Sequence, residues 1–204
     1  MPETERPFPL RSGDLALEAM LHDGAGELAA LVLHPHPRYG GDMHNHVVVA
    51  LCRALAALGA TTLRFNFRGT GNGEGAFDCG RGEANDARAA LGALAAEAPR
   101  ARLIVIGYSF GAGVAASIAG DVEIAGLVLV SLPALTRPVT LPADVPELVI
   151  TGELDAIASH EALRPLCGGA AHLVIVPGVD HAWWPGVDIL AREVSSFAAT
   201  LISR

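Results

Sequence analysis

One serine of this chain lies in a pattern that is typical of a nucleophile. The segment Gly107-Tyr108-Ser109-Phe110-Gly111 fits G-x-S-x-G and stands where an apolar, β-rich run gives way to an alanine-rich run. A serine at such a strand-to-helix junction lies on a strained turn that exposes its hydroxyl, and the glycines are needed because the two backbones crowd together there. The alternative is an ordinary glycine-rich turn with a serine that caps the helix. We predict that Ser109 is a nucleophile.

A serine hydroxyl attacks well only when a base takes its proton, so the motif predicts a histidine and a carboxylate later in the chain. The expected order is serine, acid, histidine, with each partner on a loop that follows a strand. Asp155 follows the apolar run 148–151, and His181 follows the run 173–176. We therefore expect His181 to be the general base and Asp155 to orient it.

Other interpretations of the two partners stay open at this point. Glu153 and Asp180 are rival acids in the same two loops. Asp155 could also cap a turn or a helix, and His181 could be a surface histidine packed on the two tryptophans that follow it. Asp155 and His181 are preferred because they stand where the fold requires an acid and a base.

Acyl transfer also needs donors that hold the negative oxygen of the tetrahedral intermediate. The amide of Phe110 is the first candidate, because it follows the nucleophile at a helix N-terminus. The second donor should come from the loop after the run 28–34, in which Pro35 and Pro37 have no N–H. The remaining amides there are those of His36, Arg38 and Tyr39.

Apolar strand-like runs alternate with helical stretches along the chain. The runs cover 14–21, 28–34, 61–67, 102–107, 124–131, 146–151 and 171–177, and the helical stretches lie near 45–58, 82–97, 109–119, 159–166 and 187–203. This alternation predicts an α/β fold with a mostly parallel, twisted sheet of about seven or eight strands and helices on both faces. The short turn 23–26 predicts that the first two runs form an antiparallel hairpin at the edge.

Composition and charge bound the class of protein. The chain has 204 residues, of which 51% are hydrophobic and 18% charged, which fits a single domain over residues 1–204. The net charge of −8 and the lack of any basic cluster argue against nucleic acid as a partner. The first residues hold charges and prolines rather than the apolar stretch of a secretory signal, so we expect a cytoplasmic protein.

Two further features could be mistaken for special sites. Residues 103–120 carry no charge, but their glycines and the change from β-rich to alanine-rich sequence indicate a strand, a turn and a helix rather than a membrane span. The three cysteines are far apart, so neither a disulfide framework nor a Cys-x-x-Cys metal site is indicated.

Four histidines fall between residues 34 and 46, and histidine is a common zinc ligand. No cysteine, H-E-x-x-H pattern or paired carboxylate completes a metal site there, so we expect no metal and a buried, hydrogen-bonded His34. The glycine-rich segment 69–73 resembles a phosphate-binding loop only loosely. We expect a turn there, with Arg68 as a structural ion-pair partner.

At these residues the chain resembles the α/β-hydrolase superfamily, and within it is similar to small, capless bacterial serine hydrolases distantly related to dienelactone hydrolases. The landmarks are, in order, the segments 33–37, 40–43, 65–69, 71–75, 107–111, 152–155 and 180–181. The resemblance implies a fold without a cap domain. Dienelactone hydrolases carry a cysteine where this chain has Ser109, so their substrate is not implied.

The resemblance also bears on the second oxyanion donor. Alignment of His34-Pro35-His36 with the His-Gly-X segment of the superfamily places the amide of His36 in the donor position, with Pro35 standing where many relatives carry glycine.

The expected activity is cleavage of a small-molecule carboxylic ester through an acyl-enzyme on Ser109, without a cofactor. A thioesterase, an amidase or an acyltransferase would use the same residues, and a catalytically silent binding protein of the same fold is the alternative of another class. About fourteen residues link the runs ending at 131 and starting at 146, which leaves little room for a lid, so we expect short acyl chains. Tyr39 and Trp183 are the expected substrate contacts. No membrane partner is expected, and a homodimer stays open.

Overall fold

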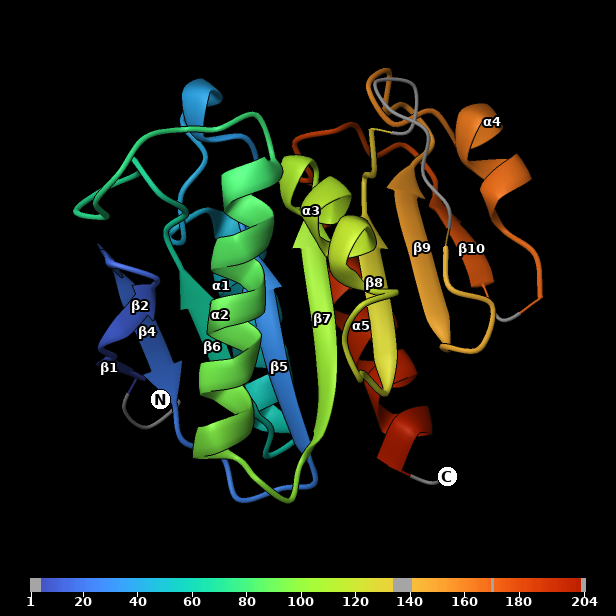
Figure 1. Ribbon diagram of the computed structural model, residues 1–204. Coiled ribbons are helices and arrows are strands. Elements are labelled where there is room, and N and C mark those ends of the chain that lie inside the picture. The colour runs from blue at the N-terminus through green and yellow to red at the C-terminus, as the bar shows by residue number, and fades with distance from the viewer. Residues whose placement is uncertain (1–4, 134–140, 170, 203–204) are drawn as a thin grey trace.

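The computed structural model describes residues 5–133, 141–169 and 171–202 (Figure 1). They form one eight-stranded sheet, ordered β1-β4-β6-β5-β7-β8-β9-β10, and a separate two-stranded sheet of β2 (Leu10–Ser12) and β3 (Leu15–Leu17). The strands of the large sheet are β1 (Glu5–Pro7), β4 (Ala19–His22), β5 (Leu28–Leu33), β6 (Thr61–Phe65), β7 (Arg102–Tyr108), β8 (Gly126–Val130), β9 (Glu147–Gly152) and β10 (Ala171–Val176).

In the large sheet, neighbouring strands from β6 to β10 run parallel, and β4 is antiparallel to both of its neighbours, β1 and β6. The strands β5, β6, β8 and β9 are buried along their whole length, because helices cover both faces of the sheet. The predicted α/β class with a mostly parallel sheet is therefore confirmed.

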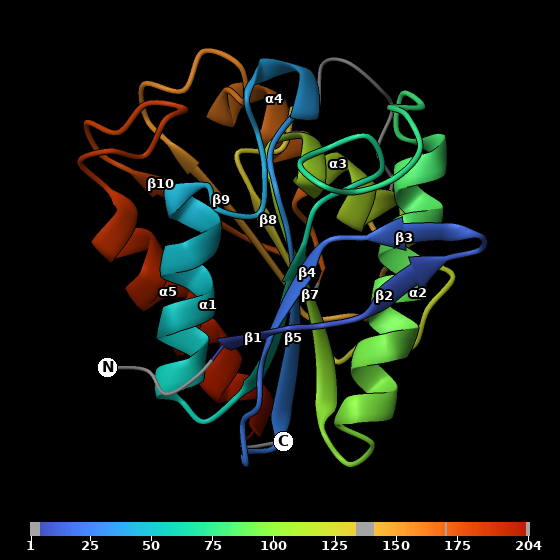
Figure 2. The same ribbon diagram turned by 90° about the vertical axis from the view of Figure 1, so that its left-hand side faces the viewer.

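The helices form two layers, one on each face of the sheet (Figures 1 and 2). On one face α1 (His46–Ala57) packs against α5 (Val187–Ile202), and on the other α2 (Arg81–Glu97) packs against α3 (Phe110–Ile118). The two layers enclose separate apolar cores with the sheet between them. The shorter helical elements are η1 (Pro37–Tyr39), α4 (His160–Leu163) and η3 (Arg164–Leu166).

The parallel strands bring several loops to one edge of the sheet. In Figure 1 the arrowheads of β5, β7, β8 and β9 point to the same edge. The segments that follow β5, β7, β8, β9 and β10 therefore meet there, and they include both the serine motif and the two loops expected to hold its partners.

The predicted hairpin between the first two runs is wrong. β4 pairs with β6, and β6 lies between β4 and β5. The connection crosses the start of β6 at close range: the amide and the carbonyl of Gly24 both bond to the hydroxyl of Thr61 at 3.2 Å, and a Cβ on Gly24 would lie 2.3 Å from the carbonyl carbon of Ala60. The glycines at 24 and 26 thus permit a close crossing of backbones rather than a tight turn.

The uncharged segment 103–120 is a strand, a turn and a helix, as expected. Within the described ranges, the helices are all too short or too polar to cross a membrane. Residues 134–140 of the link in which a cap would be inserted lie outside the described residues.

Candidate active site

Ser109 lies between the end of β7 and the start of α3, with φ 55° and ψ −115°. The flanking glycines are required by contact. A Cβ on Gly107 would lie 2.2 Å from the carbonyl oxygen of Gly111, and one on Gly111 would lie 2.5 Å from the carbonyl oxygen of Leu33. This crowding explains the spacing of the motif, since no larger residue fits where the helix starts against the neighbouring strand.

The structure brings Ser109, His181 and Asp155 together. His181 Nε2 lies 3.0 Å from Ser109 Oγ, and His181 Nδ1 lies 2.9 Å and 3.0 Å from the two oxygens of the Asp155 carboxylate. Because the carboxylate accepts a hydrogen bond from Nδ1–H, the lone pair of Nε2 faces the serine hydroxyl. The arrangement can move a proton from serine to imidazole.

The carboxylate of Asp155 is completely buried. Burial alone would raise its pKa, but hydrogen bonds from His181, from the Ser131 side chain and from the amide of Ala158 outweigh it, so that the pKa of Asp155 lies below its usual value. Its Oδ1 also accepts from the amide of Ile157 at 3.0 Å. The group is therefore held as an anion in one orientation.

The rival acids have other partners. Glu153 Oε2 accepts from the amide of Gly178 at 2.9 Å, and Asp180 Oδ1 accepts from the amide of Ala182 at 3.0 Å. The His181 ring packs beside the Tyr108 ring at 5.7 Å, and the Tyr108 hydroxyl donates to the carbonyl oxygen of His181 at 2.6 Å. Glu153 thus links the loops after β9 and β10, and Asp180 stabilises its own loop. The interpretation of His181 as a histidine packed on tryptophans loses its support.

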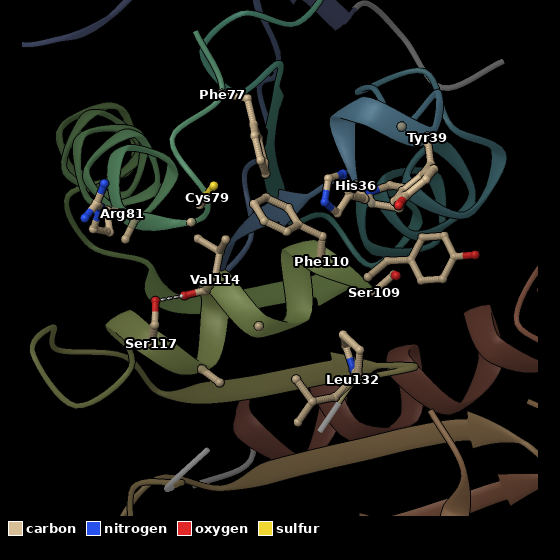
Figure 3. Close-up of a pocket in the computed structure, with 18 of the residues that line it drawn as sticks. His36, Tyr39, Phe77, Cys79, Arg81, Ser109, Phe110, Val114, Ser117 and Leu132 are labelled. Atoms are coloured by element: carbon tan, nitrogen blue, oxygen red, sulfur yellow. Dashed lines mark hydrogen bonds between the residues drawn. The ribbon is translucent and has the colours of Figure 1, made fainter. Parts of the chain in front are cut away.

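The local geometry separates the three candidates for the second oxyanion donor. The amide of Arg38 donates to His36 Nδ1 at 3.2 Å, and the amide of Tyr39 donates to the carbonyl oxygen of His36 at 3.0 Å. In the described part of the chain the amide of His36 has no such acceptor. The amide of Phe110 is at the first position of α3, where helix amides lack an intrahelical acceptor. Figure 3 shows the His36 and Phe110 side chains next to Ser109, with ring centroids 4.9 Å apart.

The two predicted substrate contacts differ in position. Tyr39 is 87% exposed and lines the cavity in front of Ser109. The prediction for Trp183 is wrong: its side chain is fully buried among the residues that pack against α5, and Nε1 donates to the hydroxyl oxygen of Ser131 at 2.9 Å. The protein interior supplies both the apolar environment and the hydrogen-bond acceptor that the indole needs, so the Trp183 side chain is not available to contact a substrate.

Ser131 is a site residue that the sequence reasoning missed. It follows β8, is fully buried, and has φ 49°. Its oxygen already accepts the indole N–H of Trp183, so its own proton is available to the Asp155 carboxylate with which it bonds. Its position at the end of an apolar strand-like run, at the same edge of the sheet as Ser109 and Asp155, was the sequence feature that could have identified it.

The expected structural roles of His34 and Arg68 are confirmed. His34 is fully buried, its Nε2 accepts from the amide of Phe67 at 3.1 Å, and burial lowers its pKa to about 4, so the ring is neutral. Arg68 forms an ion pair with the buried Asp86 at 2.7 Å. Across the described residues, no group of three or more histidine, cysteine or acidic side chains is arranged to hold a metal ion.

Comparison with known proteins gives relatives over nearly the whole chain. No family model matches it. An uncharacterized protein of Rickettsia prowazekii is 33% identical in an alignment 189 residues long that covers 85% of this chain and 79% of that protein. A solved α/β serine hydrolase without a lid from Xanthomonas campestris is 30% identical with a TM-score of 0.89, covering 100% of this chain and 98% of that one. An α/β serine hydrolase homologue from Coxiella burnetii is 29% identical with a TM-score of 0.87, covering 95% and 97%. The chain therefore belongs to the α/β serine hydrolases without a lid.

Proposed function

We propose that this protein hydrolyses carboxylic esters through an acyl-enzyme on Ser109. The observation that carries the proposal is the continuous hydrogen-bonded series from Ser109 through His181 to the buried carboxylate of Asp155. It opens on a cavity of about 1250 Å³ that is lined by Ser109 and His181 together with His36 and Phe110.

In the first half of the proposed reaction, His181 Nε2 takes the Ser109 proton while Oγ bonds to the ester carbonyl carbon. The amides of His36 and Phe110 hold the resulting negative oxygen, an effect worth about 3 to 4 kcal/mol per donor in well-studied cases. The intermediate then collapses, and His181 gives its proton to the departing alcohol. Asp155 stabilises the imidazolium between these steps.

In the second half, water attacks the acyl-enzyme. His181 takes a proton from the water while the water oxygen bonds to the acyl carbon. His181 then gives this proton to Ser109 Oγ when the carboxylic acid leaves. The protein side chains thus supply every proton transfer, and the mechanism calls for no cofactor. Thioesters, amides and acyl transfer would use the same groups, because only the leaving group or the acceptor differs.

The test is covalent labelling with a fluorophosphonate, followed by mass analysis of the peptides. We expect one label on Ser109, and Ser109→Ala should lose both the label and the turnover of p-nitrophenyl esters. Ser117→Ala is a matched control, because Ser117 lines the same cavity but its hydroxyl donates to the carbonyl oxygen of Val114 on its own helix. Label on another residue, or full activity in Ser109→Ala, would refute the assignment.

Two further measurements define the reaction. The rate should rise with pH through a single ionisation, because only a neutral imidazole accepts the serine proton. A parallel panel of p-nitrophenyl esters, acyl thioesters and acyl anilides should show the highest kcat/KM for the oxygen esters. A preference for thioesters or anilides would replace the ester in the proposal.

A further inference from the structure

The cavity in front of Ser109 extends well beyond the reacting atoms. It continues along α3, where Gly113 and Ser117 line it, past the end of this helix to Gly120, and along the start of α2. From Ser109 to Ser117 this is about 12 Å at 1.5 Å per helical residue. Figure 3 shows Ser109 near one end of α3 and Ser117 and Arg81 toward the other. We call the part of the cavity between α2 and α3 the α3 cleft.

The position of His181 decides which part of an ester can enter the α3 cleft. His181 must reach the oxygen of the leaving alcohol to give it a proton. It stands on the loop that leads into α5, which covers the opposite face of the sheet from α2 and α3. In the orientation proposed below, the leaving group lies beside His181 and the acyl group points toward the α3 cleft.

The lining of the α3 cleft is suited to an aliphatic chain. The apolar residues of this lining include Phe110, Phe77, Val114 and Leu132. At the far end Arg81 and Arg88 also line it, but they form ion pairs with Asp78 and Asp121 at 3.1 Å and 2.7 Å. Since both guanidinium groups have a carboxylate partner, the α3 cleft offers apolar contact rather than a free counter-charge for an acidic acyl group.

Glycine at position 113 of α3 is not explained by packing. A Cβ there would meet nothing within 4 Å, and its φ is not positive. Glycine inside a helix is less favourable than alanine, so the fold gains nothing from glycine at this position. Gly120 lies two residues beyond the end of α3, and a Cβ there would also meet nothing within 4 Å. The missing side chains leave the floor of the α3 cleft open.

We propose that the α3 cleft is the acyl subsite and that the preferred substrates are esters of extended aliphatic acids longer than butyrate. This inference rests on the proposed ester hydrolysis. It replaces the expectation of short acyl chains, which assumed that little apolar surface can enclose a long chain when there is no cap. A fully buried methylene raises affinity about four-fold and a half-buried one about two-fold, so each added carbon should raise kcat/KM about two-fold while the chain lies in the cleft.

The experiment measures kcat/KM for p-nitrophenyl acetate, butyrate, hexanoate, octanoate and decanoate below micelle formation. Gly113→Leu places a side chain one helical turn from Ser109, and Ser117→Leu places one a turn further along. Gly92→Leu is the matched control on α2: it also has nothing within 4 Å of its Cβ, but it does not line the cavity. Thermal unfolding of each variant accompanies the kinetics.

We expect the octanoate-to-acetate ratio of kcat/KM to be well above one in the wild type and to fall at least ten-fold in Gly113→Leu. Ser117→Leu should leave hexanoate close to the wild type and reduce decanoate, and Gly92→Leu should follow the wild type throughout. A wild-type maximum at acetate or butyrate, or an equal loss for all esters in Gly113→Leu and Ser117→Leu, would overturn the acyl subsite while ester hydrolysis stands. Failure of the wild type to turn over any ester, together with no label on Ser109, would instead remove the proposed function itself.

Discussion

The indole Nε1 of Trp183 donates a hydrogen bond to the Ser131 hydroxyl oxygen at 2.9 Å, and both residues have positive φ angles, 62° and 49°. Such backbone costs about 1 to 3 kcal/mol for a non-glycine residue, so it persists only where the surroundings hold it. The Ser131 side chain also forms a hydrogen bond with the Asp155 carboxylate, so the pair lies next to this carboxylate. The pair therefore supports the carboxylate that orients His181.

Ser131→Gly tests this support. Glycine adopts a positive φ without strain, so the substitution removes the hydroxyl and leaves the backbone in place. Loss of a donor raises the pKa of Asp155, and we expect kcat to fall about ten-fold, or 1.4 kcal/mol, with little change in KM. Activity should also decline at a higher pH than in the wild type as the medium is acidified. Unchanged kcat with an unchanged acid limb would show that Ser131 only fills space.

Glu147 should make stability depend on pH. It is 2% exposed, burial raises its pKa from 4.5 to about 7, and its Oε1 has no hydrogen-bond partner among the described residues. Since the folded pKa lies above the unfolded one, stability is highest below the unfolded pKa, falls as the pH rises through about 7, and then levels off. The difference in the free energy of unfolding between Glu147→Gln and the wild type should therefore grow by about 2 to 3 kcal/mol in favour of the variant from pH 5 to pH 8. Urea unfolding at both pH values measures this, with Glu27→Gln as the control because Glu27 is exposed. The same difference in unfolding free energy between Glu147→Gln and the wild type at both pH values would contradict the prediction.

The Arg68–Asp86 ion pair should matter for stability. The Asp86 carboxylate is completely buried and accepts from the amide, Nε and terminal nitrogen of Arg68 at 2.7 to 3.2 Å. Arg68→Met leaves a buried carboxylate without its cation, and we expect a loss of about 3 to 5 kcal/mol in the free energy of unfolding. Arg81→Met breaks the exposed pair with Asp78 and should change nothing measurable. Equal effects in the two variants would be inconsistent with this account.

The crossing at Gly24 should not tolerate a side chain. A Cβ there would lie 2.3 Å from backbone atoms of Gly59 and Ala60, so Gly24→Ala must displace the start of β6 and should cost about 3 kcal/mol. Gly92→Ala provides the opposite case, because its Cβ meets nothing within 4 Å and the helix should gain up to about 1 kcal/mol. Urea denaturation midpoints compare the two, and wild-type stability in Gly24→Ala would show that the crossing is looser than the contacts indicate.

The sequence predicted the central strands and the loops of Ser109, Asp155 and His181 because their signals are local. Buried parallel strands are apolar on both faces, and the serine motif is a pattern of residue types within five positions. The edge strand β1 escaped prediction, since it is exposed along its whole length and carries no apolar alternation. Which strand β4 pairs with is decided by tertiary packing rather than by the glycines that follow it.

The orientation of individual side chains was also beyond the sequence. Trp183 is apolar over its rings and polar at Nε1, so it suits a cavity wall and a core equally well, and only the acceptor on Ser131 decides between them. The role of Ser131 depends in turn on neighbours that come from the loops after β9 and β10. A sequence pattern within one segment cannot predict that Ser131, Asp155 and Trp183, which come from three different loops, lie in contact.

The place of β5 in the sheet has a consequence for how the chain is made. All six residues from Leu28 to Leu33 are apolar and buried, and β5 pairs with β6 on one edge and β7 on the other. A ribosome adds about 5 to 20 residues per second, and about 70 residues separate the end of β5 from the start of β7, so one edge of this strand waits about 4 to 14 seconds for its partner. During that interval an unpaired apolar edge is open to other nascent chains. Synthesis slowed between codons 34 and 102 should therefore lower the yield of folded protein and increase its dependence on chaperones.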